Sequence, residues 1–190
     1  MTTSYTAEEI RIERWIEQPA DAVSRMHLIA GIDAIFWATT ARPITDPHER
    51  KAFSDLWLGD YLDTDSPYSW LALTPTGDVV GYLVGTLTSP IGNPRFAALK
   101  YFDAFASALI TYPAHLHINL DEAYRNRGIG RRLIDAFATQ VRSAGLAGFH
   151  VVTGATSRNV AFYARAGFTE IARTPWKSGK VVFLGRCSSL

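Results

Sequence analysis

The chain of 190 residues contains a single cysteine, Cys187. One cysteine excludes an internal disulfide framework and a cysteine-based zinc cluster, because both need more than one thiol. Such sparse use of cysteine is typical of proteins that work in a reducing compartment. We therefore expect a cytoplasmic protein, and nothing in the sequence indicates a metal.

An excess of charge of either sign is also missing. The 19 lysine and arginine residues and the 18 aspartate and glutamate residues leave a formal net charge of +1. A protein that works by binding the backbone of a nucleic acid usually carries a basic excess. We expect no nucleic-acid partner, and any basic patch must be local.

Long apolar runs are the third absence. The apolar stretch at residues 79–87 has the length of a strand, whereas a membrane-spanning helix needs roughly 20 apolar residues. The first residues, MTTSYTAEEIRIER, lack the apolar core of a signal peptide. The length suits a single domain over residues 1–190, and we expect no membrane partner.

The sequence does contain strand and helix patterns in alternation. Apolar runs and period-two patterns predict strands at residues 10–13, 69–73, 79–87, 115–120, 149–153, 168–172 and 181–184. Helices are predicted to begin at Asp21 and at Asp46-Pro47, and to cover residues 93–110, 128–141 and 157–166. This alternation indicates an α/β fold, and hairpins near both ends make its sheet mixed.

A loop rich in glycine and arginine follows the strand that ends at Leu120 and opens the next helix. We call this segment, Arg125-Asn126-Arg127-Gly128-Ile129-Gly130, the glycine–arginine loop. Helix N-termini present unpaired N–H groups, and glycine lets a ligand approach the backbone closely. The pattern predicts an anion site, although a helix start with a solvated basic face fits these residues about equally well.

Two other phosphate-binding loops are disfavoured. A Walker loop needs the triplet Gly-Lys-Ser/Thr, which does not occur in the sequence. A dinucleotide fingerprint needs a third glycine where the chain has Leu133, and an acid at the end of the next strand, where the chain reads Thr153-Gly154-Ala155.

The glycine–arginine loop resembles the Arg/Gln-x-x-Gly-x-Gly/Ala motif of the GNAT superfamily of N-acetyltransferases. Residues 159–168, NVAFYARAGF, resemble the second motif of that family, which ends in a Phe-Tyr pair followed by Gly-Phe. The match covers about residues 115–172, and element order extends it to the rest. The resemblance implies a GNAT-like α/β fold with a central, mixed, splayed sheet of about six to seven strands, flanked by helices on both faces.

The same resemblance implies acetyl-coenzyme A as cosubstrate, without a metal. The coenzyme would lie between the strand that ends at Leu120 and the strand at 149–153, and Tyr163 would protonate the departing thiolate. Many members carry an asparagine where this chain has Thr156, and Asn159 is a candidate to replace it. The coenzyme contacts implied are Ile118, Leu120, Arg125, Asn126, Arg127, Gly128, Ile129, Gly130, Arg131, Asn159 and Phe162.

Two further segments carry a narrower likeness. Residues 112–118, YPAHLHI, and 181–186, VVFLGR, resemble the acetyltransferase-like C-terminal domain of eukaryotic O-GlcNAc hydrolase and its free-standing bacterial relatives. That eukaryotic domain is suspected of having lost coenzyme binding, whereas this chain keeps the glycine–arginine loop. The likeness leaves open a module that binds acetyl-coenzyme A or a peptide without useful catalysis.

Polar side chains alternate along the strand before the loop. His115, His117 and Asn119 share one face, because alternate residues of a strand point the same way. Histidine titrates near neutral pH, as a base for an ammonium acceptor should. We predict that His117, with Asn119, positions or deprotonates the acceptor. A structural role in hydrogen bonding remains an equal alternative for His117 and is favoured for His115.

Acids and aromatic residues gather in the first two helices, which shape the acceptor pocket in the family that this chain resembles. An acid can hold a cationic amine and aromatic rings can line its site. Core packing and solvated helix faces explain the same residues more simply. The candidate acceptor residues are Asp33, Trp37, Asp60 and Tyr61.

These observations favour an acetyl-coenzyme A-dependent N-acetyltransferase that transfers acetyl directly to an amine of a small molecule or a peptide. We expect a monomer or a homodimer. The alternatives are the catalytically weak binding module described above and a different nucleotide-binding protein.

Overall fold

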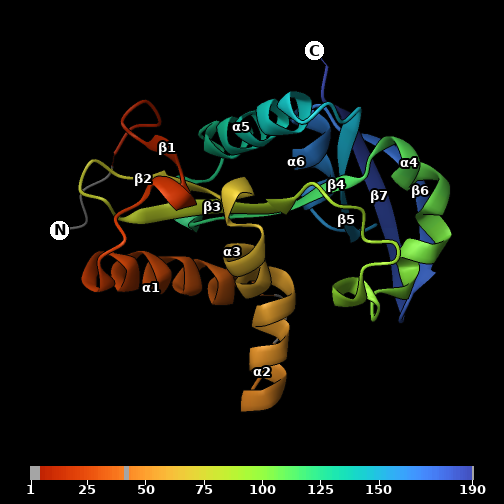
Figure 1. Ribbon diagram of the computed structural model, residues 1–190, viewed down its shortest axis with the longest axis horizontal. Coiled ribbons are helices and arrows are strands. Elements are labelled where there is room, and N and C mark those ends of the chain that lie inside the picture. The colour runs from red at the N-terminus through yellow and green to blue at the C-terminus, as the bar shows by residue number, and fades with distance from the viewer. Residues whose placement is uncertain (1–4, 41–42, 190) are drawn as a thin grey trace. The chain divides into compact units, whose positions relative to one another are not determined.

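The computed structural model describes residues 5–40 and 43–189. Within these residues, seven strands form one mixed sheet in the order β1-β2-β3-β4-β5-β7-β6. The sheet is flanked by helices and does not close into a barrel (Figure 1). The predicted α/β class, the mixed sheet and the number of strands are therefore confirmed.

The chain divides into two compact units whose boundaries cut through β4 (Ala114–Leu120) and α5 (Ile129–Ser143). The first unit comprises Met1–Gly85 and His117–Phe137, and the second comprises Thr86–Leu116 and Ala138–Leu190. In the described part of the chain, no helix is long and apolar enough to cross a membrane.

Three antiparallel strands open the sheet in the first unit. β1 (Arg11–Arg14) pairs with β2 (Trp70–Leu73), which pairs with β3 (Val79–Thr86). The predicted hairpin turn closes as the Thr74 amide donates to the Asp78 carbonyl oxygen at 2.9 Å. Gly77 adopts a φ of +91° there, which a residue with a side chain rarely takes.

Helix α1 (Ala22–Thr39) lies on one face of β3 and the start of α5 on the other (Figure 1). The Asp21 side chain caps α1 by accepting from the Ser24 amide, as predicted. Val23 and Met26, at helical spacing in the sequence, are 80% and 70% exposed. The face of α1 that enters the core consists of Leu28, Ile32, Ile35 and Phe36.

The second helical segment contains a π-helical turn. α2 (Pro47–Ser54) begins at the predicted cap, where the Glu49 amide donates to the Asp46 carboxylate at 2.8 Å. The π turn η2 (Asp55–Gly59) follows, and α3 (Asp60–Thr64) continues from it. Such turns are rare and often lie at functional sites.

Strand β5 (Gly148–Gly154) organises the second unit. It runs parallel to β4, with Ala114 opposite Phe149, and antiparallel to β7 (Gly179–Cys187). β7 pairs in turn with β6 (Thr169–Trp176), which forms an edge of the sheet. α6 (Asn159–Arg165) follows β5, as predicted.

The single helix predicted over residues 93–110 is wrong. The chain forms two 3₁₀ segments, η4 (Pro94–Phe96) and η5 (Lys100–Phe105), and then a short helix, α4 (Ala106–Thr111). A 3₁₀ helix has three residues per turn, and the buried side chains here recur at intervals of three. These side chains are Phe96, Leu99, Phe102 and Phe105.

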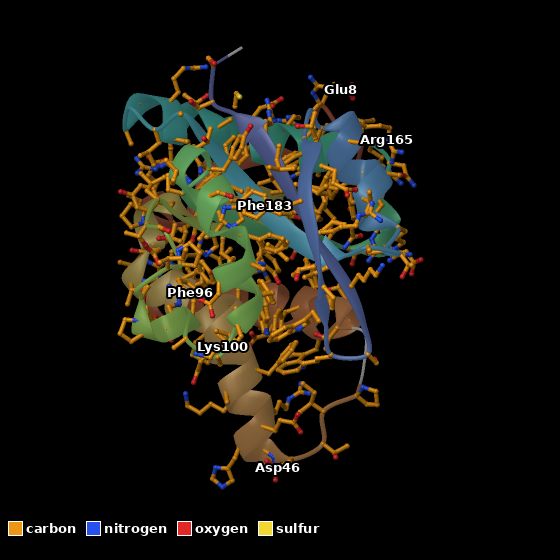
Figure 2. The ribbon with its side chains drawn as sticks, turned by 90° about the vertical axis from the view of Figure 1, so that its right-hand side faces the viewer. Glu8, Asp46, Phe96, Lys100, Arg165 and Phe183 are labelled. Carbon is orange, nitrogen blue, oxygen red and sulfur yellow. The ribbon has the colours of Figure 1, made fainter. Side chains whose placement is uncertain are left out.

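Aromatic packing fills the core of the second unit. Phe183 of β7, labelled in Figure 2, stacks on the ring of His150 with centroids 4.4 Å apart. His150 Nδ1 lies 2.6 Å from the Tyr112 carbonyl oxygen. The ring of His115 lies 5.2 Å from that of His150 and is 3% exposed. This burial among rings is the structural setting that the sequence favours for His115.

Candidate active site

The glycine–arginine loop is built from local contacts at the end of β4. The Asp121 side chain caps a 3₁₀ turn, Glu122–Tyr124, by accepting from the Ala123 amide at 2.8 Å. Arg125 Nε then donates to the Leu120 carbonyl oxygen at 3.2 Å, which folds the loop back on the strand. Positive φ angles of 60° at Asn126 and 80° at Gly128 complete the turn into α5.

The N-terminus of α5 follows the glycine–arginine loop directly. The Arg132 amide donates to the Gly128 carbonyl oxygen at 3.1 Å, so the helical ladder starts at Gly128. The first four N–H groups of a helix have no acceptor within the helix, and the helix dipole adds positive charge there. No atom lies within 4 Å of the place where a Gly128 side chain would stand. This geometry suits a phosphate.

Two arginines of this region bind the N-terminal segment of the chain. Arg127 Nη1 donates to the Tyr5 carbonyl oxygen at 2.9 Å, and Arg132 Nη1 donates to the Ala7 carbonyl oxygen at 2.7 Å. Nothing in the sequence indicates these long-range contacts, because a backbone carbonyl as partner leaves no residue-type signal. Both guanidinium groups therefore connect the region of the glycine–arginine loop to the start of the described chain.

The outer half of β4 carries the polar face that alternation predicts. His117, Ile118, Asn119 and Leu120 are all half-buried, in contrast to the buried first half of the strand. His117 Nε2 lies 3.0 Å from the hydroxyl of Tyr61 on α3. The ring of Trp57 on η2 meets the imidazole edge-on, with centroids 5.0 Å apart. Two predicted site residues, His117 and Tyr61, are thus in direct contact.

Asn119 is joined to a tyrosine that the sequence did not indicate as part of the site. Its Nδ2 donates to Tyr82 Oη on β3 at 2.8 Å. Burial raises the pKa of Tyr82, and the hydrogen bond from Asn119 offsets part of that rise. The available signal was a phenol within an otherwise apolar strand, since a buried tyrosine hydroxyl usually requires a polar partner.

Asp33 of α1 is partly buried near this network. Burial raises the pKa of its carboxyl, and the positive charge of Arg50 lowers it in part. The negative charge of Asp33 also raises the pKa of Tyr82, which places the two groups within electrostatic reach. An acid held in this way can pair with an incoming cation.

An aromatic row leads from α1 toward His117, and it consists of Trp37, Phe53 and Trp57. Trp37 and Phe53 have ring centroids 6.2 Å apart, and Phe53 and Trp57 6.3 Å apart. All three rings are half-buried. The guanidinium of Arg50 covers Trp37 at 3.4 Å from the ring centroid. Phe53 and Arg50 were not predicted to belong to the site.

Asp60, the remaining acceptor candidate, lies in a different setting. The hydrogen bond that the Lys51 ammonium donates to Asp55 raises the pKa of Lys51 most, and the negative charges of Asp55, Asp60 and Asp63 raise it further. Lys51 and Asp55 form an exposed ion pair on this helical segment. Asp60 is half-buried and lies within electrostatic reach of Lys51, whereas Asp33 and Trp37 belong to the electrostatic and aromatic network described above.

The second motif forms α6 in the second unit. Tyr163 is 7% exposed, and its ring packs against Phe168 with centroids 5.3 Å apart. Burial raises the pKa of the Tyr163 phenol, so it stays protonated across the physiological range. Phe162 is half-buried beside it, and Asn159 is exposed, with its amide donating to Ser157 Oγ at 3.2 Å.

Within residues 5–40 and 43–189 there is no group of three or more histidine, cysteine, aspartate or glutamate side chains placed to hold a metal ion.

Solved structures of other proteins have the same fold. The crystal structure of SsHAT matches with a TM-score of 0.70 at 24% identity, over 96% of this chain and 100% of that chain. A polyamine N acetyltransferase of Drosophila melanogaster matches at 0.62 and 16% identity, over 94% and 99%. A chain of the NatC complex bound to Gag peptide and CoA matches at 0.60 and 15%, over 94% and 98%.

The sequence model described as the acetyltransferase (GNAT) family matches residues 32–168. This range begins just before Asp33 and ends at Phe168, so it includes the outer half of β4, the glycine–arginine loop and α6.

Proposed function

The chain belongs to the acetyltransferase (GNAT) family, and we propose that it is an N-acetyltransferase that moves the acetyl group of acetyl-coenzyme A to an amine. The observation that carries the proposal is the start of α5, where the helix begins after a left-handed glycine and within a cluster of arginines. Helix N-termini of this kind bind phosphate groups.

In this proposal the coenzyme pyrophosphate binds the backbone amides of Arg127 to Arg131. Arg127 and Arg132 donate hydrogen bonds to the N-terminal segment. Their guanidinium groups attract the pyrophosphate from a distance through their positive charge. The backbones of Ile118 and Leu120 pair with the pantetheine arm, and Arg125 and Asn126 hold the loop in shape. Asn159 and Phe162 are proposed as further coenzyme contacts. We also propose that the two compact units belong to one domain.

The reaction is direct transfer of acetyl to nitrogen. His117 removes a proton from the ammonium form of the acceptor, and Asn119 orients the resulting amine. The amine attacks the thioester carbonyl carbon, the C–N bond forms and the C–S bond breaks. Tyr163 donates its proton to the departing thiolate, which leaves as coenzyme A thiol. The products are an N-acetyl amine and coenzyme A.

We propose a cationic amine as acceptor. The Asp33 carboxylate offers a negative charge with reduced solvation, and Trp57, whose ring lies beside that of His117, is of the residue type whose ring face binds ammonium groups. Polyamine and peptide N-terminal amines are both of this class. We also propose that the chain is related to the acetyltransferase-like domain of O-GlcNAc hydrolase. The sequence likeness of residues 112–118 and 181–186 supports this relationship.

A thermal-shift comparison of coenzyme A, ATP and NAD tests the binding step, because a ligand that binds only the folded state raises its melting temperature. Coenzyme A should raise the temperature, and stabilisation by ATP or NAD alone would contradict the proposal. Release of coenzyme A thiol in the presence of a panel of polyamines and peptides then tests transfer. Binding without turnover over the whole panel would favour the binding module, for which the deep burial of Tyr163 is the supporting observation.

A further inference from the structure

An arginine packs on the face of a tryptophan in the candidate acceptor site. The central guanidinium carbon of Arg50 lies 3.4 Å from the centroid of the Trp37 ring, which is van der Waals contact. Phe53, which follows Arg50 on α2, packs on the same tryptophan with ring centroids 6.2 Å apart. These contacts place the charge of Arg50 over the end of α1. The arginine is nevertheless exposed, so a ligand can reach it from solvent.

Asp33 brings a negative charge to the same side of α1. It precedes Trp37 by one helical turn, and residues four apart in a helix share a face. Burial raises the pKa of the Asp33 carboxyl, and the positive charge of Arg50 lowers it in part. Helix geometry and electrostatics therefore agree that Asp33 and Arg50 lie within reach of each other. One surface of the first unit presents both signs of charge.

The negative charge is on the inner side of this pair. Asp33 is half-buried, whereas Arg50 is exposed. Burial raises the pKa of Tyr82, and the negative charge of Asp33 adds to that rise. Tyr82 is 0% exposed, and its hydroxyl accepts a hydrogen bond from Asn119 of β4 at 2.8 Å. An acceptor that arrives from solvent thus meets Arg50 first and Asp33 deeper, toward the polar face of β4.

Asp33 alone would suit any cationic amine, including a polyamine. Arg50 changes this selection, because its positive charge repels a second ammonium group and its planar N–H donors match the two oxygens of a carboxylate. We propose that Arg50 is a specificity-determining residue and that the acceptor is an amine that also carries a carboxylate. The ammonium group of the acceptor pairs with Asp33, and its carboxylate pairs with Arg50. The inference rests on the proposed function, whose class of acceptor it narrows.

The contact with Trp37 is compatible with this role. A guanidinium donates through N–H groups that lie in its own plane, so a ring that packs on its face does not occupy those donors. The ring also restricts the long side chain of Arg50, and a restricted side chain loses less conformational entropy when it binds a ligand. Trp37 therefore presents the arginine to a carboxylate and does not neutralise its charge.

The first test measures binding to the wild-type protein without turnover, by ligand NMR titration in the presence of coenzyme A. The probes are pairs with equal numbers of carbon atoms: β-alanine and 1,3-diaminopropane, 4-aminobutanoate and putrescine, 5-aminopentanoate and cadaverine. At least one amino acid should bind roughly 3- to 10-fold more tightly than its diamine, because attraction to Arg50 replaces repulsion. If every diamine binds as tightly as its amino acid, or if no probe binds, the inference is overturned.

The second test repeats the titrations with Arg50→Gln, Arg50→Lys and Arg25→Gln. Arg25 is the matched control, because it packs on the Trp15 ring at 4.0 Å and lies about two helical turns before Asp33 on α1. Arg50→Gln should lose the preference for the amino acid. Arg50→Lys should keep part of it, since lysine retains the charge without the planar donors. Arg25→Gln should keep all of it.

Melting curves check that each variant is folded. A preference that persists unchanged in folded Arg50→Gln, or in Arg50→Lys and Arg50→Gln alike, would reduce Arg50 to a packing contact between α1 and α2, and the inference would fail.

Turnover of the same probes with acetyl-coenzyme A separates the two proposals. If the amino acids are preferred in binding but none is acetylated, recognition by Asp33 and Arg50 stands and the proposed transfer fails. If the wild type and Arg50→Gln acetylate amino acids and diamines with the same ratio of kcat/KM, the chain is an N-acetyltransferase and the inference about Arg50 fails.

Discussion

The ring of Tyr112 lies directly against the backbone of Gly148. A Cβ atom on this glycine would stand 2.6 Å from Tyr112 Cδ1 and 2.7 Å from the Arg186 carbonyl oxygen. Gly185, on the neighbouring strand β7, faces the same ring, with a Cβ position 3.0 Å from Tyr112 Cε1. Glycines on two adjacent strands thus make room for one aromatic ring, and both strands depend on it for packing.

Gly148→Ala should therefore destabilise the protein. The new methyl group overlaps backbone as well as ring atoms, so relaxation requires the strands to shift, at a cost of about 1–3 kcal/mol. Thermal unfolding should show a melting temperature lower by several degrees. Gly154→Ala is the matched control at the other end of β5, because its nearest neighbour, Ser157 Cβ, would be 3.9 Å away. If the two substitutions lower the melting temperature equally, the close packing of Tyr112 against Gly148 is contradicted.

Gly128→Ala should weaken coenzyme binding in addition to straining the loop. Gly128 has a φ of +80°, with open space around it, so the methyl group costs conformational energy of about 1–2 kcal/mol and no steric overlap. Gly77→Ala imposes similar strain in the β2–β3 turn, where φ is +91° and space is equally open. Both variants should melt at lower temperature, but only Gly128→Ala should raise the KM for acetyl-coenzyme A. A similar KM in both variants would contradict the proposed phosphate site.

Asp33→Asn should stabilise the protein while it weakens activity. Burial raises the pKa of Asp33, so the folded state binds this proton more tightly than the unfolded state does. The stability that this proton contributes is lost as the pH rises from the ordinary carboxyl range through the folded pKa. Asp33→Asn has no carboxylate to bury and does not lose this stability. It should therefore melt at a higher temperature than the wild type at pH 7, and the difference should shrink as the pH falls toward 4.

The activity of Asp33→Asn is measured in parallel, with Asp103→Asn, an exposed acid of the second unit, as control. If Asp33 binds the ammonium of the acceptor, the variant raises the KM for that amine and leaves the KM for acetyl-coenzyme A unchanged. A stabilised variant with unchanged acceptor kinetics would make Asp33 a residue without a role in the site.

Tyr163→Phe should lower kcat by roughly 100-fold, a typical contribution of a general acid. The buried phenol keeps its proton at neutral pH, since burial raises its pKa, and a phenylalanine ring retains the contact with Phe168. Steady-state kinetics and a melting curve check this together. Unchanged turnover in a protein of wild-type stability would assign Tyr163 to packing alone.

Local signals were sufficient for the parts of the fold that depend on local chemistry. Asp21 and Asp46 cap α1 and α2 as their side-chain chemistry predicts, and the apolar side chains of α5 recur at helical spacing. Residues 94–105 were misassigned because apolar residues three apart fit an α-helix nearly as well as a 3₁₀ helix. Only tertiary packing of Phe96 and Phe102 decides between the two.

The candidate site was predictable in its residue types and incomplete in its contacts. Period-two alternation put His117 and Asn119 on one face of β4, and the structure agrees with that alternation. Their partners come from elsewhere in the chain: Tyr61 is 56 positions before His117 and Tyr82 is 37 before Asn119. Pairings over such separations follow from the assembled sheet and helices, and no local pattern encodes them.

Arg127 and Arg132 donate hydrogen bonds to the carbonyl oxygens of Tyr5 and Ala7. These bonds couple the start of the described chain to the glycine–arginine loop. Segments joined in this way open together, and a ligand that closes one of them protects the other. Amide hydrogen exchange in residues 5–14 should therefore slow when an anion occupies the loop. Hydrogen exchange in this N-terminal peptide would then report on binding at the proposed phosphate site, although the peptide is not proposed to contact the ligand.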